Sequence, residues 1–284
     1  MPEPVNAEKL ASIVEELPTL PSVMFEVLAV AEDERSTASD LEDDIMRDQA
    51  LSAKILKVAN SAFYGIPRSV DTVSRATVLL GFQTVVGLAL TVSVYDTLWG
   101  AGKGHYLDRR ELWKHSLGVA TAARFLSPNR NSKEAAVGFT AGMLHDVGKT
   151  IFDSHLSEEY GKVIEECHRQ QTPIYQVEIA ILGIDHGELG SRVARRWQLP
   201  EILCESIRCH HVPGQAAADF ARMSALINLA DTVTRQLGIG ESGDTAVAQH
   251  NPDAIRIWGL SPDKLANAAA ELEGFRDKIA SMQA

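Results

Sequence analysis

Apolar residues recur every three to four positions through most of the chain, the spacing of helices that bury one face. In the first half this pattern predicts a helix that Asp40 caps and that continues to Ala59, and a second helix over residues 70–80. Gly65-Ile66-Pro67 supplies a turn between them. Residues 85–94 repeat the helical period, and their β-branched content also fits a strand. Because they have no alternating polar face, we predict a helix there.

Helical spacing also dominates the second half. The segment between Trp99 and Arg109 contains glycines and charged residues and is the best candidate for a linker. A loop rich in Gly, Ser and Asp is expected at 238–251, after which Ser261 and Pro262 begin a last amphipathic helix. The other periodic stretches of this half are 111–126, 134–144, 156–170, 176–182, 189–197 and 220–237.

These patterns predict an all-α fold, a two-lobed helical bundle. We assign residues 1–100 to an N-terminal helical lobe, 101–110 to the linker, 111–240 to a second helical lobe and 241–284 to a loop and a C-terminal helix. The apolar stripe of the last helix either packs on the body of the protein or forms the contact of a homodimer.

Composition and charge narrow the functional classes. The net charge of -11 argues against a nucleic-acid-binding surface, although a cleft could still be locally positive. The apolar stretch 85–94 has about half of the roughly 20 residues that a membrane span requires. The three cysteines form no CxxC pair, and the first six residues have no basic start followed by an apolar stretch. We expect a cytoplasmic protein without a membrane or nucleic-acid partner.

Five of the nine histidines, together with two aspartates, carry the candidate chemistry. In order they are His115, His145-Asp146, His186, His210-His211 and Asp231. Each of these residues or residue pairs lies on, or at the end of, a different predicted helix. A helical bundle can project such residues onto a shared centre. Imidazole and carboxylate ligands suit divalent metals such as Fe, Mn, Zn, Co or Ni. The alternative is a coincidence of unrelated packing histidines.

The doublet His145-Asp146 suggests how one or two ions would be held. On one helix the two side chains would point about 100° apart and could address one ion from two sides. The two oxygens of Asp146 could also face separate ions, and two metals roughly 3.5–4 Å apart would activate a water and clamp a phosphate in an in-line displacement. Asp146 is therefore a candidate catalytic residue as well as a ligand.

Two sets of cations have alternative interpretations. Lys149 either contacts a substrate phosphate, which makes it the second candidate catalytic residue, or ends a helix together with Gly148. Arg192, Arg195 and Arg196 share one helix face. They form either an anion clamp or a solvated arginine face.

The histidine and aspartate set resembles that of a known superfamily. His115, His145-Asp146 and Asp231 are similar to the H…HD…D signature of the HD superfamily of metal-dependent phosphohydrolases. His186, His210 and His211 are similar to the extra histidines of its two-metal relatives, which include the HD-GYP cyclic-di-GMP phosphodiesterases. The resemblance implies that the first set holds one metal and the three other histidines hold a second, with Asp146 bridging them.

Further blocks of sequence resemble the HDOD family of this superfamily and lie in that family's order. The resemblance covers about residues 17–237 and implies an all-helical bacterial signalling protein with an HD-like second half. Two departures are Asp48-Gln49 in place of Asp-Pro and the absence of Gly-Tyr-Pro after His211, which argues against cyclic-di-GMP hydrolysis. The matching blocks are Leu17–Pro21, Ala50–Gly65, Ala76–Gly81, Gly142–Lys149, Arg195–Pro200 and His210–Pro213.

The resemblance implies a signal-transduction protein with a candidate dinuclear site for one or two divalent transition-metal ions. Such a protein would act by binding a signalling partner protein or a small anionic or nucleotide ligand. The alternative is a metal-dependent phosphohydrolase acting on a nucleotide or cyclic dinucleotide. A third hypothesis is a structural interaction protein whose site holds no metal.

Overall fold

The computed structural model describes residues 7–33, 35–61, 63–66, 68–100, 106–130 and 132–281, without the side chains of residues 99 and 100. All regular structure within these ranges is helical, which confirms the all-α prediction. None of the described helices is both long and apolar enough to cross a membrane. In chain order the helices are α1 (Ala7–Glu16), α2 (Ser22–Glu32), α3 (Ala38–Ile45), α4 (Gln49–Ala59), α5 (Val73–Leu80), α6 (Phe82–Gly100), α7 (Arg109–Leu126), α8 (Lys133–Leu144), α9 (Val147–His155), α10 (Ser157–Gln170), α11 (Ile174–Leu182), α12 (His186–Arg196), α13 (Glu201–Cys209), the 3-10 turn η1 (Pro213–Gln215), α14 (Ala218–Gln236), α15 (Pro252–Trp258), α16 (Pro262–Glu273) and α17 (Arg276–Ala280).

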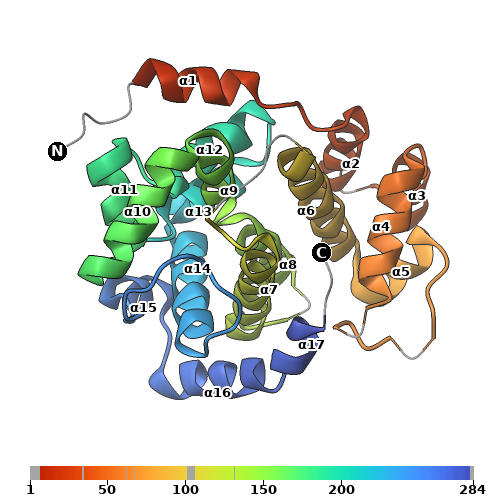
Figure 1. Ribbon diagram of the computed structural model, residues 1–284. Coiled ribbons are helices and arrows are strands. Elements are labelled where there is room, and N and C mark those ends of the chain that lie inside the picture. Colours follow the sequence, from red (N-terminus) through yellow and green to blue (C-terminus); the bar gives the residue numbers. More distant parts are fainter. Residues whose placement is uncertain are drawn as a thin grey trace.

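The helices form two neighbouring groups (Figure 1). Helices α2–α6 lie on one side and α7–α15 on the other, with α1 across the top and α16 and α17 underneath. Helix α6 packs against α8, and buried apolar residues from both groups form one continuous core. Residues 101–105 of the predicted linker lie outside the described residues. The division into lobes at 1–100, 111–240 and 241–284 therefore stays a prediction.

Several helix boundaries differ from those expected. Asp40 does not cap α3: Thr37 is the cap, and the two side chains form a capping box in which Asp40 is the third helical residue. The chain then breaks before Asp48, which caps α4. The predicted last helix begins at Ser261 as expected, but it is divided into α16 and α17 after Glu273; α16 packs on α7. Helices α1 and α2, and the short helices α9, α13 and α15, were not predicted. Because Gly148 and Lys149 lie in the first turn of α9, the interpretation that they end a helix is wrong.

Two glycines allow the helices that carry the candidate site to approach closely. A Cβ at Gly142 in α8 would lie 2.7 Å from Cα of Ala120 in α7. A Cβ at Gly148 in α9 would collide with the carbonyl oxygen of His186, the first residue of α12. The pairs α7–α8 and α9–α12 therefore pack backbone against backbone at these points.

The three arginines that share a face of α12 all have partners within the chain. Arg192 pairs with Glu188, Arg195 pairs with Glu201 and Glu205, and Arg196 donates to the carbonyl oxygens of Glu15 and Leu17. Trp197, directly after α12, donates its indole N–H to the carbonyl oxygen of Pro18 at 3.0 Å. These contacts hold α1 and the chain leading to α2 on α12, so the arginines act in packing and ion pairing within the fold.

Asn60, which follows α4, holds the connection to α5 in place. Its side-chain amide donates to the carbonyl oxygen of Val70 at 2.7 Å and accepts from the N–H of Val70 at 2.6 Å. In Asn60→Ala both of these backbone groups lose their partner, and we expect the free energy of unfolding to fall by about 1–3 kcal/mol. Urea denaturation measures this loss. The matched control is Asn267→Ala on exposed α16 surface, and an equal loss in both variants would contradict the assignment.

Candidate metal centre

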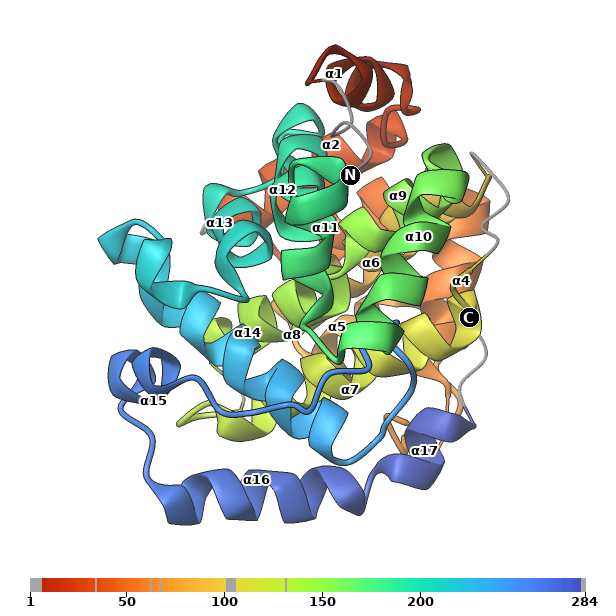
Figure 2. The same ribbon diagram turned by 60° about the vertical axis from the view of Figure 1, so that its left-hand side comes forward.

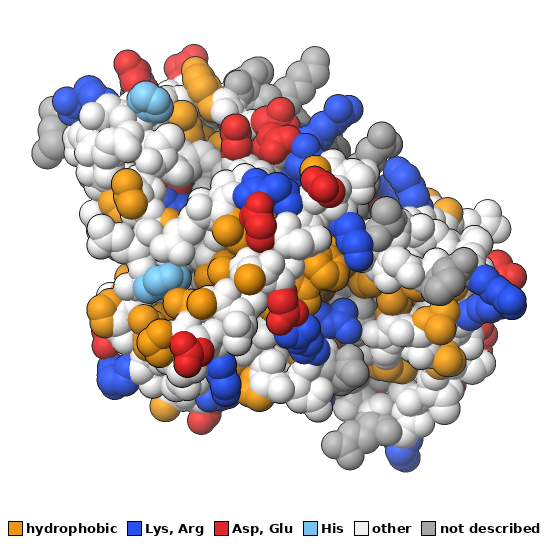
Figure 3. Space-filling view, turned by 90° about the horizontal axis from the view of Figure 1, so that it is seen from below, with side chains coloured by type: hydrophobic (Ala, Val, Ile, Leu, Met, Phe, Trp, Pro, Cys, Tyr) orange, Lys and Arg blue, Asp and Glu red, His pale blue; other side chains and the backbone are white. Residues whose placement is uncertain are grey.

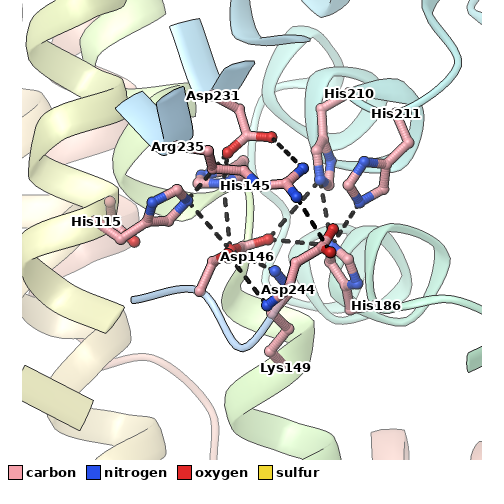
Figure 4. Close-up of polar contacts among 12 residues, drawn as sticks. His115, His145, Asp146, Lys149, His186, His210, His211, Asp231, Arg235 and Asp244 are labelled. Atoms are coloured by element: carbon pink, nitrogen blue, oxygen red, sulfur yellow. Dashed lines mark hydrogen bonds and ion pairs between the residues drawn. The ribbon is translucent and has the colours of Figure 1, made fainter. Parts of the chain in front are cut away.

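The seven residues predicted as metal ligands converge at one place inside the α7–α14 group (Figure 4). Apart from the half-buried His211, each is at most 6% exposed. The doublet does not lie on one helix as expected, because His145 is the C-terminal cap of α8 and Asp146 is the N-terminal cap of α9. The others come from α7 (His115), the start of α12 (His186), the end of α13 (His210 and His211) and α14 (Asp231).

The carboxylate of Asp146 lies between two groups of imidazoles. Its Oδ2 lies 3.6 Å from Nε2 of His115 and 3.3 Å from Nε2 of His145. Its Oδ1 lies 3.0 Å from Nε2 of His186 and 3.8 Å from Nε2 of His210. Each oxygen therefore faces a different group. Within each of the sets His115–His145–Asp146 and His186–His210–His211, the candidate donor atoms lie within 4.8 Å of one another.

Hydrogen bonds on the far side of three rings orient them toward the centre. In each case Nδ1 donates its proton, which directs Nε2 at the site, where it can bind a metal once it carries no proton. The acceptors are the carbonyl oxygen of Gly142 for His145 (2.8 Å), the carbonyl oxygen of Ile207 for His210 (2.7 Å) and Oε2 of Glu178 for His186 (2.6 Å).

Several buried polar atoms at the centre lack a bonding partner, and a bound cation would provide one. Nε2 of His115, Nε2 of His145 and Oδ1 of Asp146 are buried, and none makes a hydrogen bond of acceptable geometry within the described residues. Nε2 of His186 lies 3.2 Å from Nε2 of His210 and 2.9 Å from Nε2 of His211. Nitrogens about 3 Å apart suit an ion with metal–nitrogen bonds of about 2.0–2.1 Å. The donor set therefore fits a divalent transition metal.

The protonation states of the imidazoles also suit ligands. Burial lowers the pKa of His115, and burial together with the neighbouring imidazoles holds the pKa of His210 and His211 well below the usual value. Burial opposes protonation of His186. The charge of Glu178 and the hydrogen bonds of His186 with Asp146 and Glu178 outweigh this effect and raise the pKa of His186 to about 9. At neutral pH most of these rings are neutral, as metal binding requires, and His186 releases a proton when a metal binds.

Two cations and a third aspartate lie beside the candidate ligands. Lys149 Nζ lies 2.7 Å from Asp146 Oδ2. Burial opposes the ionisation of Asp146, but His145 and Lys149 outweigh it, so the pKa of Asp146 is well below its ordinary value. One turn after Asp231, Arg235 pairs with Asp244 at 3.1 Å. Asp244 belongs to the segment between α14 and α15, which runs alongside α14 (Figure 2).

A polar cavity of about 400 Å³ opens onto this centre. Its lining includes the candidate ligands His211 and Asp231 together with Asn228, Arg235 and Tyr175. The ring of Tyr175 stacks on that of His211, with centroids 4.4 Å apart. A ligand in this cavity would meet both the candidate metal ligands and a guanidinium.

Sequence reasoning missed three residues of this site: Glu178, Arg235 and Asp244. Glu178 had a usable signal, because it is the one charged residue in the apolar stretch Ile174–Leu182, and a buried carboxylate needs partners. Nothing in the sequence marked Arg235 or Asp244 as part of the site. The first continues an ordinary helix, and the second lies in a stretch that reads as an exposed loop.

Glu178→Gln should lower the affinity for metal by about 10- to 100-fold, because the carboxylate orients His186 and raises its basicity. Competition with a chromophoric chelator measures this affinity. Tyr160→Phe is the matched control: it removes the hydroxyl that donates to the same carboxylate at 3.2 Å and leaves the His186 contact intact. Unchanged affinity in Glu178→Gln would contradict the role given to this residue.

Comparisons with known proteins identify the family and the fold of this chain. The family model of the HDOD domain matches residues 17–213. An uncharacterized protein of Treponema pallidum (strain Nichols) is 26% identical over 266 residues, 93% of this chain and 50% of that protein. The chain thus spans about half the length of this curated relative.

Solved structures share the fold. An HDOD domain protein of unknown function from Geobacter sulfurreducens is 25% identical and superimposes with a TM-score of 0.78, over 98% of this chain and 100% of the other. A candidate phosphohydrolase from Shewanella amazonensis is 24% identical, with a TM-score of 0.72 over 95% of each chain. Since the HDOD match spans more than half of the residues, this chain belongs to the HDOD domain family.

Proposed function

We propose that this HDOD protein is a signal-transduction protein that holds two divalent transition-metal ions and acts by binding a small anionic ligand, such as a nucleotide, or a signalling partner protein. One observation carries the proposal: Asp146 lies between two imidazole groups with one carboxylate oxygen toward each. In this assignment His115, His145 and Asp231 hold one ion, and His186, His210 and His211 hold the other.

The donor chemistry limits the metal to a few elements. Nitrogen and oxygen donors without thiolate suit Fe, Mn, Zn, Co or Ni. When bound, the ions would supply positive charge and Lewis acidity to a phosphate. We place the protein in the cytoplasm, because Cys167, Cys204 and Cys209 are free, as is usual in a reducing compartment.

The cavity beside the centre supports an anionic ligand. Arg235 lines it, and its present partner Asp244 comes from the segment between α14 and α15. A phosphate or carboxylate in the cavity would compete with Asp244 for that guanidinium, which offers paired donors to such groups. Asn228 and Tyr175 would orient the rest of the ligand, since both line the same cavity.

Hydrolysis of a phosphate ester is the second candidate function. The observation that favours it is Lys149, whose ammonium group contacts the bridging carboxylate at 2.7 Å. From this position it could hold a phosphate oxygen next to the metals. The substrate class would be a nucleotide or a cyclic dinucleotide.

Binding and turnover assays on the metal-loaded full chain separate the two functions. We expect added metal to create a saturable nucleotide-binding event that the metal-free chain lacks, and no turnover of bis(4-nitrophenyl) phosphate or of cyclic dinucleotides with added Mn or Fe. Turnover that disappears in Asp146→Ala would establish the phosphohydrolase instead. Nucleotide binding that is the same with and without metal would contradict the proposed role of the centre.

A further inference from the structure

Two neighbouring cavities lie where α5 and α6 meet α7, α8 and α17, and they share no residue with the metal centre. The first, of about 400 Å³, lies between the start of α6 and helices α7 and α8. The second, of about 350 Å³, lies between the α4–α5 connection and helices α7 and α17. Arg124, Arg130 and Phe139 line both, so the two cavities are adjacent subsites of one depression.

The first cavity is cationic in an acidic protein. Arg124, Arg130 and Lys133 line it, and no Asp or Glu is among its lining residues in the described chain. Arg130 pairs with the half-buried Glu271, whereas neither Arg124 nor Lys133 pairs with a carboxylate of the described residues. The first turn of α6 also borders the cavity, and the positive end of a helix dipole favours an anion. Against a net charge of -11, this clustering of positive charge indicates an anion subsite.

The second cavity is aromatic. The ring of Phe275 lies 6.0 Å from Phe63 and 5.2 Å from Phe125, centroid to centroid, and all three line the cavity. Tyr64 lines it as well, and its buried hydroxyl has no hydrogen-bond partner within the described residues. Lys278 stands over the Phe275 ring at 4.4 Å. Such a lining favours a flat ring that carries polar groups at its edge.

We infer that these two cavities form one metal-independent binding site for an organic phosphate that carries an aromatic ring, the chemistry of a nucleotide. The phosphate lies against Arg124, Arg130 and Lys133, which offer charge-assisted hydrogen bonds. The ring lies among the phenylalanines of the second cavity. Each cavity falls within the range of about 300–1,000 Å³ usual for small-molecule sites. Figure 3, seen from the side of α16 and α17, shows Lys and Arg side chains beside hydrophobic ones on this face.

This site differs from the one under Proposed function in its location and in being independent of metal. Titrations that do not depend on the metal centre therefore test it separately. The probe is adenosine 5′-monophosphate, titrated calorimetrically into the full chain after its metal has been removed with a chelator, with adenosine and inorganic phosphate as partial probes. We expect each partial probe to bind at least about tenfold more weakly, because each fills only one cavity. His211→Ala, which alters the metal centre and the cavity beside it, should leave this binding unchanged.

Two variants address the anion subsite directly. Lys133→Ala removes an exposed cation and should weaken binding of the nucleotide at least about tenfold. Arg124→Gln should do the same, and Lys133→Ala keeps the test valid if the half-buried Arg124 is needed for folding. Lys162→Ala is the matched control, because it removes one exposed positive charge on α10, away from both cavities.

Three results would overturn the inference. The first is no binding of the nucleotide at millimolar concentration. The second is binding that is lost in His211→Ala but kept in Lys133→Ala, which would place the ligand at the metal centre. The third is equal weakening in Lys133→Ala and Lys162→Ala, which would show general charge attraction only.

Discussion

Asp146→Ala should strip the protein of both metal ions, whereas replacement of a ligand on one side should remove only one. Asp146 is the only candidate ligand within the described residues with an oxygen toward each imidazole group. Asp231→Ala removes a carboxylate whose Oδ1 lies 3.1 Å from Nε2 of His115, and His211→Ala removes an imidazole of the other group. Elemental analysis of the three variants and the wild type measures this pattern.

The same substitution should also destabilise the fold, because Lys149 would be left buried without its partner. Breaking a buried ion pair by removing one member costs about 3–5 kcal/mol. The double variant Asp146→Ala/Lys149→Met removes the unpaired ammonium group, so it should recover part of the stability but none of the metal. Metal content that stays at the wild-type level in Asp146→Ala would contradict the bridging role.

Gly148→Ala should be strongly destabilising, although it replaces none of the candidate ligands. The added Cβ would meet the backbone of His186 and would lie 3.0 Å from the backbone nitrogen of Gly190, both in α12. Alanine is favoured over glycine in a helix by about 1 kcal/mol, but backbone atoms cannot move without separating α9 from α12. We therefore expect a loss of stability at or above the upper end of the usual overpacking range of about 1–3 kcal/mol.

Separation of α9 from α12 also moves Asp146 away from His186, so Gly148→Ala should lower the affinity for the second ion. Chemical denaturation and chelator competition measure the two effects. Gly214→Ala is the matched control, since its Cβ would have only a side-chain oxygen of Asp253 nearby, at 3.8 Å. If both variants behaved alike, the close contact of α9 with α12 would not be what positions the site.

The sequence was most informative where one residue type carries the signal. The histidines and aspartates have side chains suited to metals and occur at the ends of separate periodic stretches, so their convergence could be predicted. Glu178 acts through a hydrogen bond to His186, and Asp244 acts through an ion pair with Arg235. Such partners depend on which helices lie side by side, and residue spacing along the chain does not encode that.

The helices also differed in how well the sequence predicted them. Long periodic stretches such as α7 and α14 were predicted within a few residues, because a buried stripe repeats over many turns. Helix α9, with nine residues, lies almost wholly inside the protein, so no polar face marks it. The chain passes from α8 to α9 between His145 and Asp146, and no helix-breaking residue in the sequence marks this point.

Anomalous diffraction from crystals of the metal-loaded protein tests the central claim most directly. We expect two anomalous peaks roughly 3.5–4 Å apart, one on each side of Asp146, with His115, His145 and Asp231 around the first and His186, His210 and His211 around the second. No peak at Asp146, in crystals grown from protein that had been offered Fe, Mn, Zn, Co and Ni in turn, would contradict the account.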